Sequence, residues 1–287
     1  MRLALVSDIH GNLAALEAVM QDIERRQVHQ VVNLGDTLSG PLLPVETAQR
    51  LRRPAVPKAL SPAVRSTEGS PVSTLPWLHV AGNHERQVLR LPLPRQSPTD
   101  AYTSSQLTDA DKAWLASHAD PCDPRLHQGA MWPDRLGSDV ALCHGSPRSD
   151  IEYLLETPVG EEARLATSAD IEERLDGRIP PHIGLLVCGH THVPRSVRLG
   201  RGLLIVNPGS VGLPAYDDDH PYPLSSYHRI ENGSPDARYA VVEKRNGRWI
   251  CDLISVPYDH ESMALLADQR NRPDWAFALR TGYMPRC

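Results

Sequence analysis

Five short apolar segments of this 287-residue chain each end in side chains that can bind metal ions. The segments are LALVSDIH (3–10), VVNLGD (31–36), LHVAGNHE (78–85), VALCHGSP (140–147) and LLVCGHTH (185–192). The pattern predicts five buried strands, each followed by Asp, Asn or His. Because the chemistry of open α/β sheets lies at the carboxyl ends of their strands, we expect these side chains to form one site.

The expected metal ligands are carboxylates, one amide and imidazoles: Asp8, His10, Asp36, Asn83, His144, His190 and His192. Asp8 and His10 are two residues apart, so in an extended segment both side chains point toward one ion. His190 and His192 have the same spacing, which suggests that one serves each of two ions. Asp36 has the two oxygens needed to bridge them. Ligation by nitrogen and oxygen without thiolate favours Mn, Fe, Zn, Ni or Co, of which we favour Mn.

Two divalent ions roughly 3.5–4 Å apart promote in-line displacement at phosphorus. They generate a hydroxide nucleophile and polarise the phosphoryl oxygens. Four positive charges from the ions, less Asp8, Asp36 and a hydroxide, leave about +1 to attract an anionic phosphate. The ligand set therefore predicts hydrolysis of a phosphoester in preference to a peptide or carboxylic ester.

The segments between these motifs indicate how the chain positions them. Asn12 is an expected N-cap for a helix over 13–26, followed by a strand over 30–34 and a helix over 45–53. Further helices are expected from 108, over 161–175 and over 260–270. Strands are expected over 203–206, 239–244 and 249–256, with a hairpin turn at Asn246-Gly247. We predict an α/β fold in a single domain, a two-sheet α/β sandwich flanked by helices.

Composition limits the classes of partner. The formal net charge of −5 gives no basic surface for nucleic acid, so a nucleic-acid partner is not expected. No apolar run approaches the roughly 18 residues that cross a bilayer, and the start of the chain is not a signal peptide. Five cysteines without a CxxC pair fit a reducing compartment. We expect a cytoplasmic protein of undetermined oligomeric state, with no membrane partner.

In order, the motifs read DxH, GD, GNHE, H and GHxH, a pattern that resembles the calcineurin-like metallophosphoesterases. The resemblance implies one ion bound by Asp8, His10, Asp36 and His192. It implies a second ion bound by Asp36, Asn83, His144 and His190. His84 matches the histidine that contacts phosphate and protonates the leaving group without binding metal. The segments DIHGN, HGSP and NPGSVG are similar to those of stand-alone cytosolic bacterial and archaeal phosphoesterases, and the resemblance extends over nearly all of 1–287.

The chain departs from two groups of that family. Ser/Thr protein phosphatases and symmetrical diadenosine tetraphosphatases carry GDxxDRG, where this chain has GDTLSGP (35–41). Ser39 stands where those enzymes have the Asp that orients the catalytic histidine, and their phosphate-binding Arg is missing. The partner of His84 is therefore left open. Two segments, 54–76 and 216–233, are expected to be insertions relative to compact members.

Three residues are candidates for contact with the substrate. Arg148 and Arg195 follow two of the ligand motifs and could reach a phosphate, although arginines at such positions are more often solvated. Asn12 would direct the N-terminus of the first helix toward the anion site. The run Asp217–Asp219 is interpreted as a solvated acidic loop rather than a third metal site. Aromatic and cationic residues of 216–233 either contact the leaving group at the rim of the cleft or form a plain surface loop.

The leading hypothesis is a dinuclear metal-dependent phosphodiesterase or phosphatase. Metal-bound hydroxide would attack a small phosphorylated molecule directly, with a nucleotide favoured as substrate. The alternative enzyme is a nuclease or a phosphoesterase that processes nucleic-acid ends. A non-catalytic scaffold with the same fold is disfavoured, because all seven ligands are present.

Overall fold

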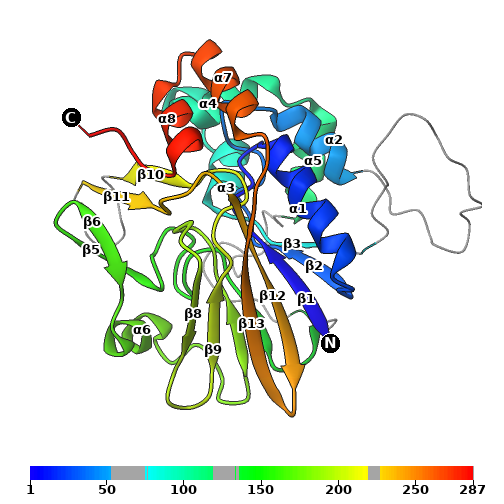
Figure 1. Ribbon diagram of the computed structural model, residues 1–287, viewed down its shortest axis with the longest axis vertical. Coiled ribbons are helices and arrows are strands. Elements are labelled where there is room, and N and C mark those ends of the chain that lie inside the picture. The colour runs from blue at the N-terminus through cyan, green and yellow to red at the C-terminus, as the bar shows by residue number, and fades with distance from the viewer. Residues whose placement is uncertain (53–74, 76, 119–132, 134–135, 219–226, 287) are drawn as a thin grey trace, which may run out of the picture.

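The computed structural model describes residues 1–52, 75, 77–118, 133, 136–218 and 227–286. Two sheets form a sandwich. The first has the order β13 (Arg248–Val256), β12 (Ala237–Arg245), β1 (Arg2–Val6), β2 (Gln30–Asn33) and β3 (Trp77–His79). The second has the order β4 (Val140–Leu142), β7 (Leu185–Val187), β9 (Leu204–Asn207) and β8 (Arg195–Arg198). The predicted α/β sandwich is thus confirmed (Figure 1).

Alternation along the strands produces the layers, because successive side chains point to opposite faces. In β1, Leu3 and Leu5 enter the core between the sheets, where they join Val140 and Leu185 of the second sheet. The intervening residues pack on the other side against helix α1 (Leu13–Arg25). Helix α6 (Ser168–Leu175) contributes to the core on the outer face of the second sheet. Strands buried on both faces explain the near-continuous apolar segments of the sequence.

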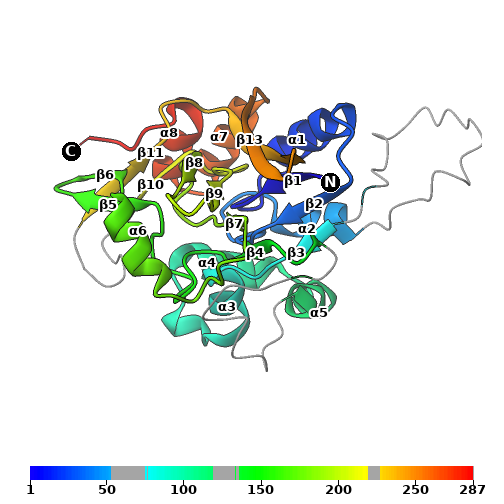
Figure 2. The ribbon, with the colours of Figure 1, turned by 90° about the horizontal axis from the view of Figure 1, so that it is seen from below.

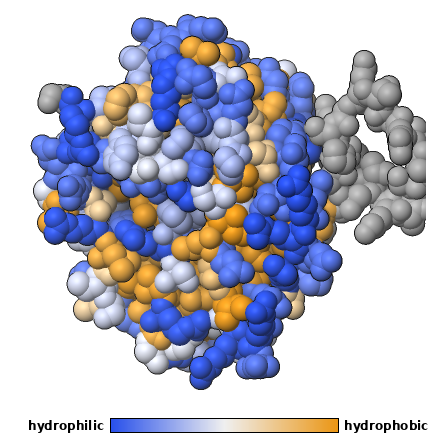
Figure 3. All heavy atoms as spheres, viewed as in Figure 1, coloured by the Kyte–Doolittle hydropathy of each residue, from blue (hydrophilic) through white to orange (hydrophobic). Residues whose placement is uncertain are grey.

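The other helices gather near one end of the sandwich, the end reached by the carboxyl termini of β1 and β2 (Figures 1 and 2). They are α2 (Pro44–Arg52), α3 (Asn83–Arg90), α4 (Pro98–Gln106), α5 (Asp109–His118), α7 (His260–Gln269) and α8 (Pro273–Thr281). A short 3-10 turn, η2 (Leu93–Arg95), precedes α4. The side of the sandwich shown in Figure 3 exposes apolar residues mainly in its lower half, away from this helical end.

A third sheet was not predicted. Its order is β10 (Ala215–Asp218), β11 (His228–Glu231), β6 (Glu162–Leu165) and β5 (Glu156–Val159). It corrects the expected helix over 161–175, since the first part of that segment is β6. Gly160, at φ 64°, allows the turn that pairs β5 with β6. Helix α6 begins only at Ser168, where Thr167 accepts a hydrogen bond from the backbone N–H of Asp170.

Most of the other expected elements are present within a residue or two of their predicted bounds, whereas α8 was missed. Asn12 caps α1 as expected, accepting a hydrogen bond from the backbone N–H of Ala15 at 3.1 Å. The proline-rich segment 54–76 lies outside the described residues except for Leu75, and its status as an insertion stays a prediction. In the part of the chain that is described, no helix is both long and apolar enough to span a bilayer.

Candidate metal centre

All seven predicted ligands lie just beyond the carboxyl ends of β1, β2, β3, β4 and β7. They converge on two groups of potential ligand atoms. One contains Asp8, His10 and His192, and the other contains Asp36, His144 and His190. Within each group, one ligand atom from each residue lies within 4.8 Å of the others. His190 and His192 fall in different groups, in agreement with the prediction that one serves each ion.

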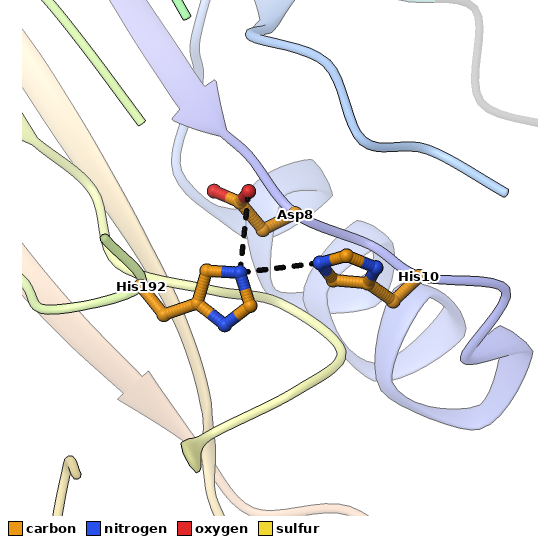
Figure 4. A group of neighbouring side chains, drawn as sticks. All are labelled: Asp8, His10 and His192. Atoms are coloured by element: carbon orange, nitrogen blue, oxygen red, sulfur yellow. Dashed lines mark hydrogen bonds and ion pairs between the residues drawn. The ribbon is translucent and has the colours of Figure 1, made fainter. Parts of the chain in front are cut away.

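Asp8, His10 and His192 meet although they come from distant parts of the chain (Figure 4). The Nε2 atoms of His10 and His192 are 3.1 Å apart, and His192 Nε2 is 3.4 Å from Asp8 Oδ1. In the second group, His144 Nε2 is 3.0 Å from Asp36 Oδ2 and 3.1 Å from Asn83 Oδ1. The amide of Asn83 therefore belongs with the second group, as the resemblance implied.

Most of the candidate ligand residues depart from extended backbone, which corrects the assumption of an extended segment behind the two-residue spacing. Five of them have left-handed φ values: Asp8 (55°), His10 (52°), Asp36 (52°), His190 (68°) and His192 (58°). Such conformations cost about 1–3 kcal/mol each and need surrounding contacts that hold them. Neighbouring ligand loops provide these contacts. The N–H of Asp8 donates to Gly35 O, and the N–H of His10 donates to Asp36 O, both at 3.0 Å.

Backbone carbonyls determine which ring nitrogen of each histidine faces the centre. Carbonyl oxygens lie near the Nδ1 atoms of His10 (Ser39 O, 2.6 Å), His144 (Leu34 O, 2.9 Å) and His192 (Leu213 O, 2.8 Å). A carbonyl can only accept, so Nδ1 donates and the lone pair of Nε2 faces inward. His190 is reversed. Its Nε2 donates to Ile151 O at 3.2 Å, which leaves Nδ1 as the inward ligand atom.

These orientations fit divalent cations. Because both Nδ1 atoms donate to carbonyls, the Nε2 atoms of His10 and His192, which lie 3.1 Å apart, are the ring nitrogens available to an ion. Asp8 Oδ1 is buried nearby without a hydrogen-bond donor. Convergent lone pairs of this kind are stabilised by a positive ion, and imidazole with carboxylate is a typical donor set for first-row transition metals.

The metal-free protein distributes protons unevenly over the site. Burial, with the neighbouring His192, lowers the pKa of His10 to about 3. Burial likewise lowers the pKa of His190 to about 4, aided by His144. Burial opposes protonation of His144 too, but the Asp36 carboxylate outweighs it and raises the pKa of His144 to about 10. In the absence of metal, the Asp36 and Asp8 carboxylates thus favour the protonated form of His144.

Gly82 and Glu85 shape the loop around Asp36. A Cβ on Gly82 would lie 2.2 Å from Asp36 Oδ1, so only glycine fits beside that carboxylate. The buried Glu85 carboxylate accepts hydrogen bonds from the backbone N–H groups of Asp36 (2.8 Å), Thr37 (2.8 Å) and Gly82 (2.7 Å). Glu85 was not predicted as a site residue, although its place in GNHE was a signal.

His84 stands beside the second group and does not belong to it. Its backbone N–H donates to Asp36 Oδ1 at 2.9 Å, and its Nδ1 is 2.8 Å from Asp100 Oδ1. Burial lowers the pKa of His84, but the Asp36 and Asp100 carboxylates outweigh this and raise it to about 9. His84 is therefore protonated at neutral pH in the metal-free protein. Asp100 was not predicted as a site residue from the sequence. It is the contact of His84 that the sequence left open.

A cleft of about 650 Å³ opens over these residues. One wall comes from α3, η2, α4 and α8, and includes Gln87, Arg95, Thr99, Arg272 and Trp275. The opposite wall comes largely from β10. Arg272 is ion-paired with Asp274 at 2.6 Å and stacks over Trp275 at 5.5 Å. Sequence analysis singled out neither Arg95 nor Arg272, because neither adjoins a ligand motif.

The three residues predicted to contact substrate make other contacts. Arg148 pairs with Glu152 and, at 3.0 Å, with Glu173, and Arg195 pairs with Glu156 at 2.8 Å. Besides capping α1, Asn12 donates to Gly212 O at 2.9 Å. None of the three is among the described residues that line the cleft. A role for them in substrate binding stays a prediction.

The segment 216–233 reaches the cleft, as predicted, through Tyr216, Asp217 and Asp218 of β10. The Tyr216 ring packs edge-on against His192, with centroids 4.6 Å apart, and its hydroxyl donates to His190 O at 3.2 Å. The interpretation of Asp217–Asp219 as a solvated loop is corrected in part, because Asp217 and Asp218 lie in the strand β10. Asp217 is exposed as expected, whereas Asp218 is half-buried and accepts from Tyr153 Oη at 2.9 Å.

The remaining aromatic and cationic residues of 216–233 are placed differently. His228 is buried and contacts Tyr153 Oη at 3.1 Å, and Arg229 pairs with Glu161 at 2.7 Å. Tyr227 is exposed and is not among the described lining residues, whereas Tyr222 and Asp219 lie outside the described residues. Whether 216–233 is an insertion relative to compact members stays a prediction.

An α/β sandwich with paired histidine and carboxylate groups at the ends of its strands has the architecture of a metallophosphoesterase. Comparison with known families agrees. The calcineurin-like phosphoesterase superfamily domain matches residues 1–228, and the chain belongs to this superfamily.

Individual relatives match along the whole length. An uncharacterized protein of Methanocaldococcus jannaschii is 22% identical over 282 residues, which cover 95% of this chain and 94% of the relative. The crystal structure of a metallophosphoesterase from Sphaerobacter thermophilus has a TM-score of 0.62 at 25% identity, covering 98% of this chain and 99% of that one. A hypothetical protein from Pyrococcus horikoshii OT3 has a TM-score of 0.64 at 17% identity, with 99% of both chains covered. These structures support the fold.

Proposed function

We propose that this protein is a dinuclear metal-dependent hydrolase of phosphoester bonds in small phosphorylated molecules, with nucleotides as the favoured substrate class. The observation that carries the proposal is the pair of ligand groups whose lone pairs converge at the floor of one cleft, with His84 beside them. Membership of the superfamily supports the same reaction class. Hydrolysis of either a diester or a monoester is compatible with this geometry.

In this proposal, one ion is held by Asp8, His10, Asp36 and His192, and the second by Asp36, Asn83, His144 and His190. Divalent ions at such a site supply positive charge that polarises a phosphoryl group and acidifies water, and manganese is the metal that we favour. Asp36 is the proposed bridging residue. Its place is determined by the Glu85 carboxylate, which accepts from the N–H of Asp36, and by His84, whose N–H donates to Asp36 Oδ1.

His84 is the proposed general acid. Its Nδ1 is engaged by Asp100 at 2.8 Å, so a proton on Nε2 is available to the cleft, which His84 lines. A leaving alkoxide that takes this proton departs as a neutral alcohol, which lowers the barrier to P–O cleavage. The Nδ1–Asp100 contact stabilises the charged imidazole before the transfer.

Water is the proposed nucleophile. Burial raises the pKa of the Cys143 and Cys188 thiols, so neither forms a reactive thiolate near neutral pH. Ser146 is buried with its hydroxyl donating to Glu152, and Ser210 donates to Asp8 O at 2.8 Å. Neither serine hydroxyl is directed by a histidine base in the described structure.

Charge in the cleft favours a small substrate over a polynucleotide. Apart from the metal ligands and the His84–Asp100 pair, the described lining has two cations, Arg95 and Arg272, and three carboxylates, Asp217, Asp218 and Asp274. Polynucleotide binding depends on neutralising many phosphates with Lys and Arg. A nuclease is therefore the alternative, and a metal-free scaffold is disfavoured by the intact ligand groups. We further propose a cytoplasmic location, on the basis of cysteine usage alone.

Metal analysis of the purified protein combined with an activity screen tests the proposal. Phosphate release and hydrolysis of nitrophenyl mono- and diesters would be measured with Mn, Fe, Zn, Ni and Co. We expect two ions per chain and turnover that is lost in His10→Ala and His144→Ala, which each remove one ligand from a different group. A protein that binds no metal and hydrolyses no phosphoester in any of these metals would refute the proposal.

A further inference from the structure

We infer that Asp100, presented by α4, is the positioning residue for His84, and that a carboxylate at position 39 could take over this role. The inference rests on the proposed function, because it concerns the group that would protonate the leaving alcohol. His84 and Asp100 are separated by 16 positions, and they lie on different helices, α3 and α4.

The Asp100 carboxylate is buried and held on both oxygens. Oδ1 accepts from Ser39 Oγ at 2.7 Å and contacts His84 Nδ1 at 2.8 Å. Oδ2 accepts from Ser97 Oγ at 2.9 Å, while Ser97 Oγ also accepts from the backbone N–H of Asp100 at 3.1 Å. With 1% of Asp100 exposed, the carboxylate has little freedom to rotate. It can therefore fix both the ring plane and the tautomer of His84.

Position 39 is directed at the same point. Ser39 Oγ and His84 Nδ1 contact the same oxygen, Asp100 Oδ1, at 2.7 and 2.8 Å. A carboxylate at position 39 would extend into the space that opens when Asp100 is shortened to Ser. The chain thus has two positions from which one negative charge can reach His84, and it uses the one on α4.

Two arginines between the C-terminal helices α7 and α8 help to hold α4 in place. Arg272, which precedes α8, donates from Nη1 to Thr99 Oγ1 at 2.7 Å, next to Asp100. Arg270 stacks over Tyr102 of α4 at 5.1 Å and donates to Pro41 O at 2.7 Å, close to Ser39. Both arginines lie beyond residue 228, where the match to the superfamily domain ends. Part of the support for α4 therefore comes from outside the matched region.

The test moves the carboxylate from position 100 to position 39. The variants are Asp100→Asn, Asp100→Ser, Ser39→Asp and the double variant Ser39→Asp/Asp100→Ser. The matched control is Asp111→Asn. Asp111 is 2% exposed and exchanges hydrogen bonds with Thr108 near the start of α5, as Asp100 does with Ser97 in α4, but it does not line the cleft. For each protein, kcat and KM are measured on phenyl and p-nitrophenyl esters of phosphate, with metal content and thermal melting measured alongside.

We expect Asp100→Asn and Asp100→Ser to keep both ions and to lose about 10- to 100-fold in kcat on the phenyl ester, part of what a general acid contributes. KM should change little. The loss should be smaller on the p-nitrophenyl ester, whose leaving group needs less protonation. The double variant should recover most of the lost kcat, whereas Asp111→Asn should match the wild type on both esters.

Three results would overturn the inference. They are an Asp100→Asn variant as active as Asp111→Asn, an equal loss on both esters, and a double variant no faster than Asp100→Ser. If Asp100→Asn and Asp100→Ser fail to fold, the folded double variant still decides by its kcat and leaving-group dependence. A wild type inactive on all phosphoesters would refute the proposed function itself. Activity without these Asp100 effects would refute the inference alone.

Discussion

The Nε2 atoms of His10 and His192 face each other at 3.1 Å, although 182 positions separate the two residues. Each ring is held from behind by a carbonyl oxygen on Nδ1, so neither can turn away without losing that hydrogen bond. Asp8 Oδ1 lies 3.4 Å from His192 Nε2, so two nitrogens and one carboxylate oxygen converge at this point. The protein thus holds a cation site in a preorganised form, and metal binding should add to the stability of the fold.

Removal of metal should lower the free energy of unfolding. An ion present at about 100 times its dissociation constant contributes about 2.7 kcal/mol, so two ions should produce a marked fall in melting temperature on chelation. Calorimetry with and without EDTA, followed by return of Mn, measures this. The melting temperature of His10→Ala should fall less on addition of EDTA, because this variant lacks a proposed ligand of one ion. A melting temperature that is the same with and without EDTA would contradict the prediction.

Asp36→Asn should weaken both metal sites, whereas Asp8→Asn should mainly weaken one. The reason is that Asp36 is the proposed bridging ligand, while Asp8 belongs to a single group. Elemental analysis of the purified variants gives the ion count per chain. Asp170→Asn, in the N-terminal turn of α6, is the control, and it should bind two ions per chain. Full metal content and full activity in Asp36→Asn would refute the assignment.

His84→Ala should retain both ions but lose about 10²–10⁴-fold in kcat if His84 is the general acid. The side chain of His84 belongs to neither ligand group, and it meets His10 only by an edge-on ring contact with centroids 5.5 Å apart, so metal content should not change. Rates on a series of aryl esters with leaving groups of different pKa measure the effect. A loss that is the same across the series would show that His84 binds or orients the phosphate instead.

Shortening the connection between β10 and β11, by replacing 219–226 with a tight turn, should raise KM for the natural substrate. It should spare kcat and KM for a small diester such as methyl p-nitrophenyl phosphate. The reason is that the strand β10 brings Tyr216, Asp217 and Asp218 to the cleft, and these residues directly precede the segment that is replaced. Steady-state kinetics on both substrates tests this. Equal responses, or none, would show that the segment does not determine specificity.

Ligand residues were predictable because each follows a short apolar strand in a local motif. That information is contained within a few residues, as in GNHE for Asn83 and His84. The separation of His190 and His192 between two groups does not follow from their spacing alone, because Asp8 and His10 have the same spacing and share one group. The left-handed backbone of five of these residues was not predictable either, because it depends on hydrogen bonds between loops that are distant in sequence.

Asp100 illustrates what could not be predicted. Its local sequence, Ser97-Pro98-Thr99-Asp100, indicates the start of a helix, and Ser97 does cap α4 by accepting a hydrogen bond from the backbone N–H of Asp100. Nothing in that segment reveals that Asp100 Oδ1 contacts His84, because this depends on how α3 and α4 pack. The prediction of a helix over 161–175 was wrong for a similar reason. Its first residues pair with β5 and β11, which are partners that periodicity does not identify.

The central position of β1 has a consequence for the synthesis of the protein. β1 lies between β2 and β12, and Leu3 pairs with Val242 on one side and with Gln30 on the other. One neighbour of β1, the strand β2, is therefore synthesised soon after it, whereas the other, β12, is synthesised much later. Until β12 leaves the ribosome, one edge of an apolar strand has no partner, which is a state prone to aggregation. A chain truncated before residue 237 would lack this strand, and the first sheet should complete its pairing only after β12 has been synthesised.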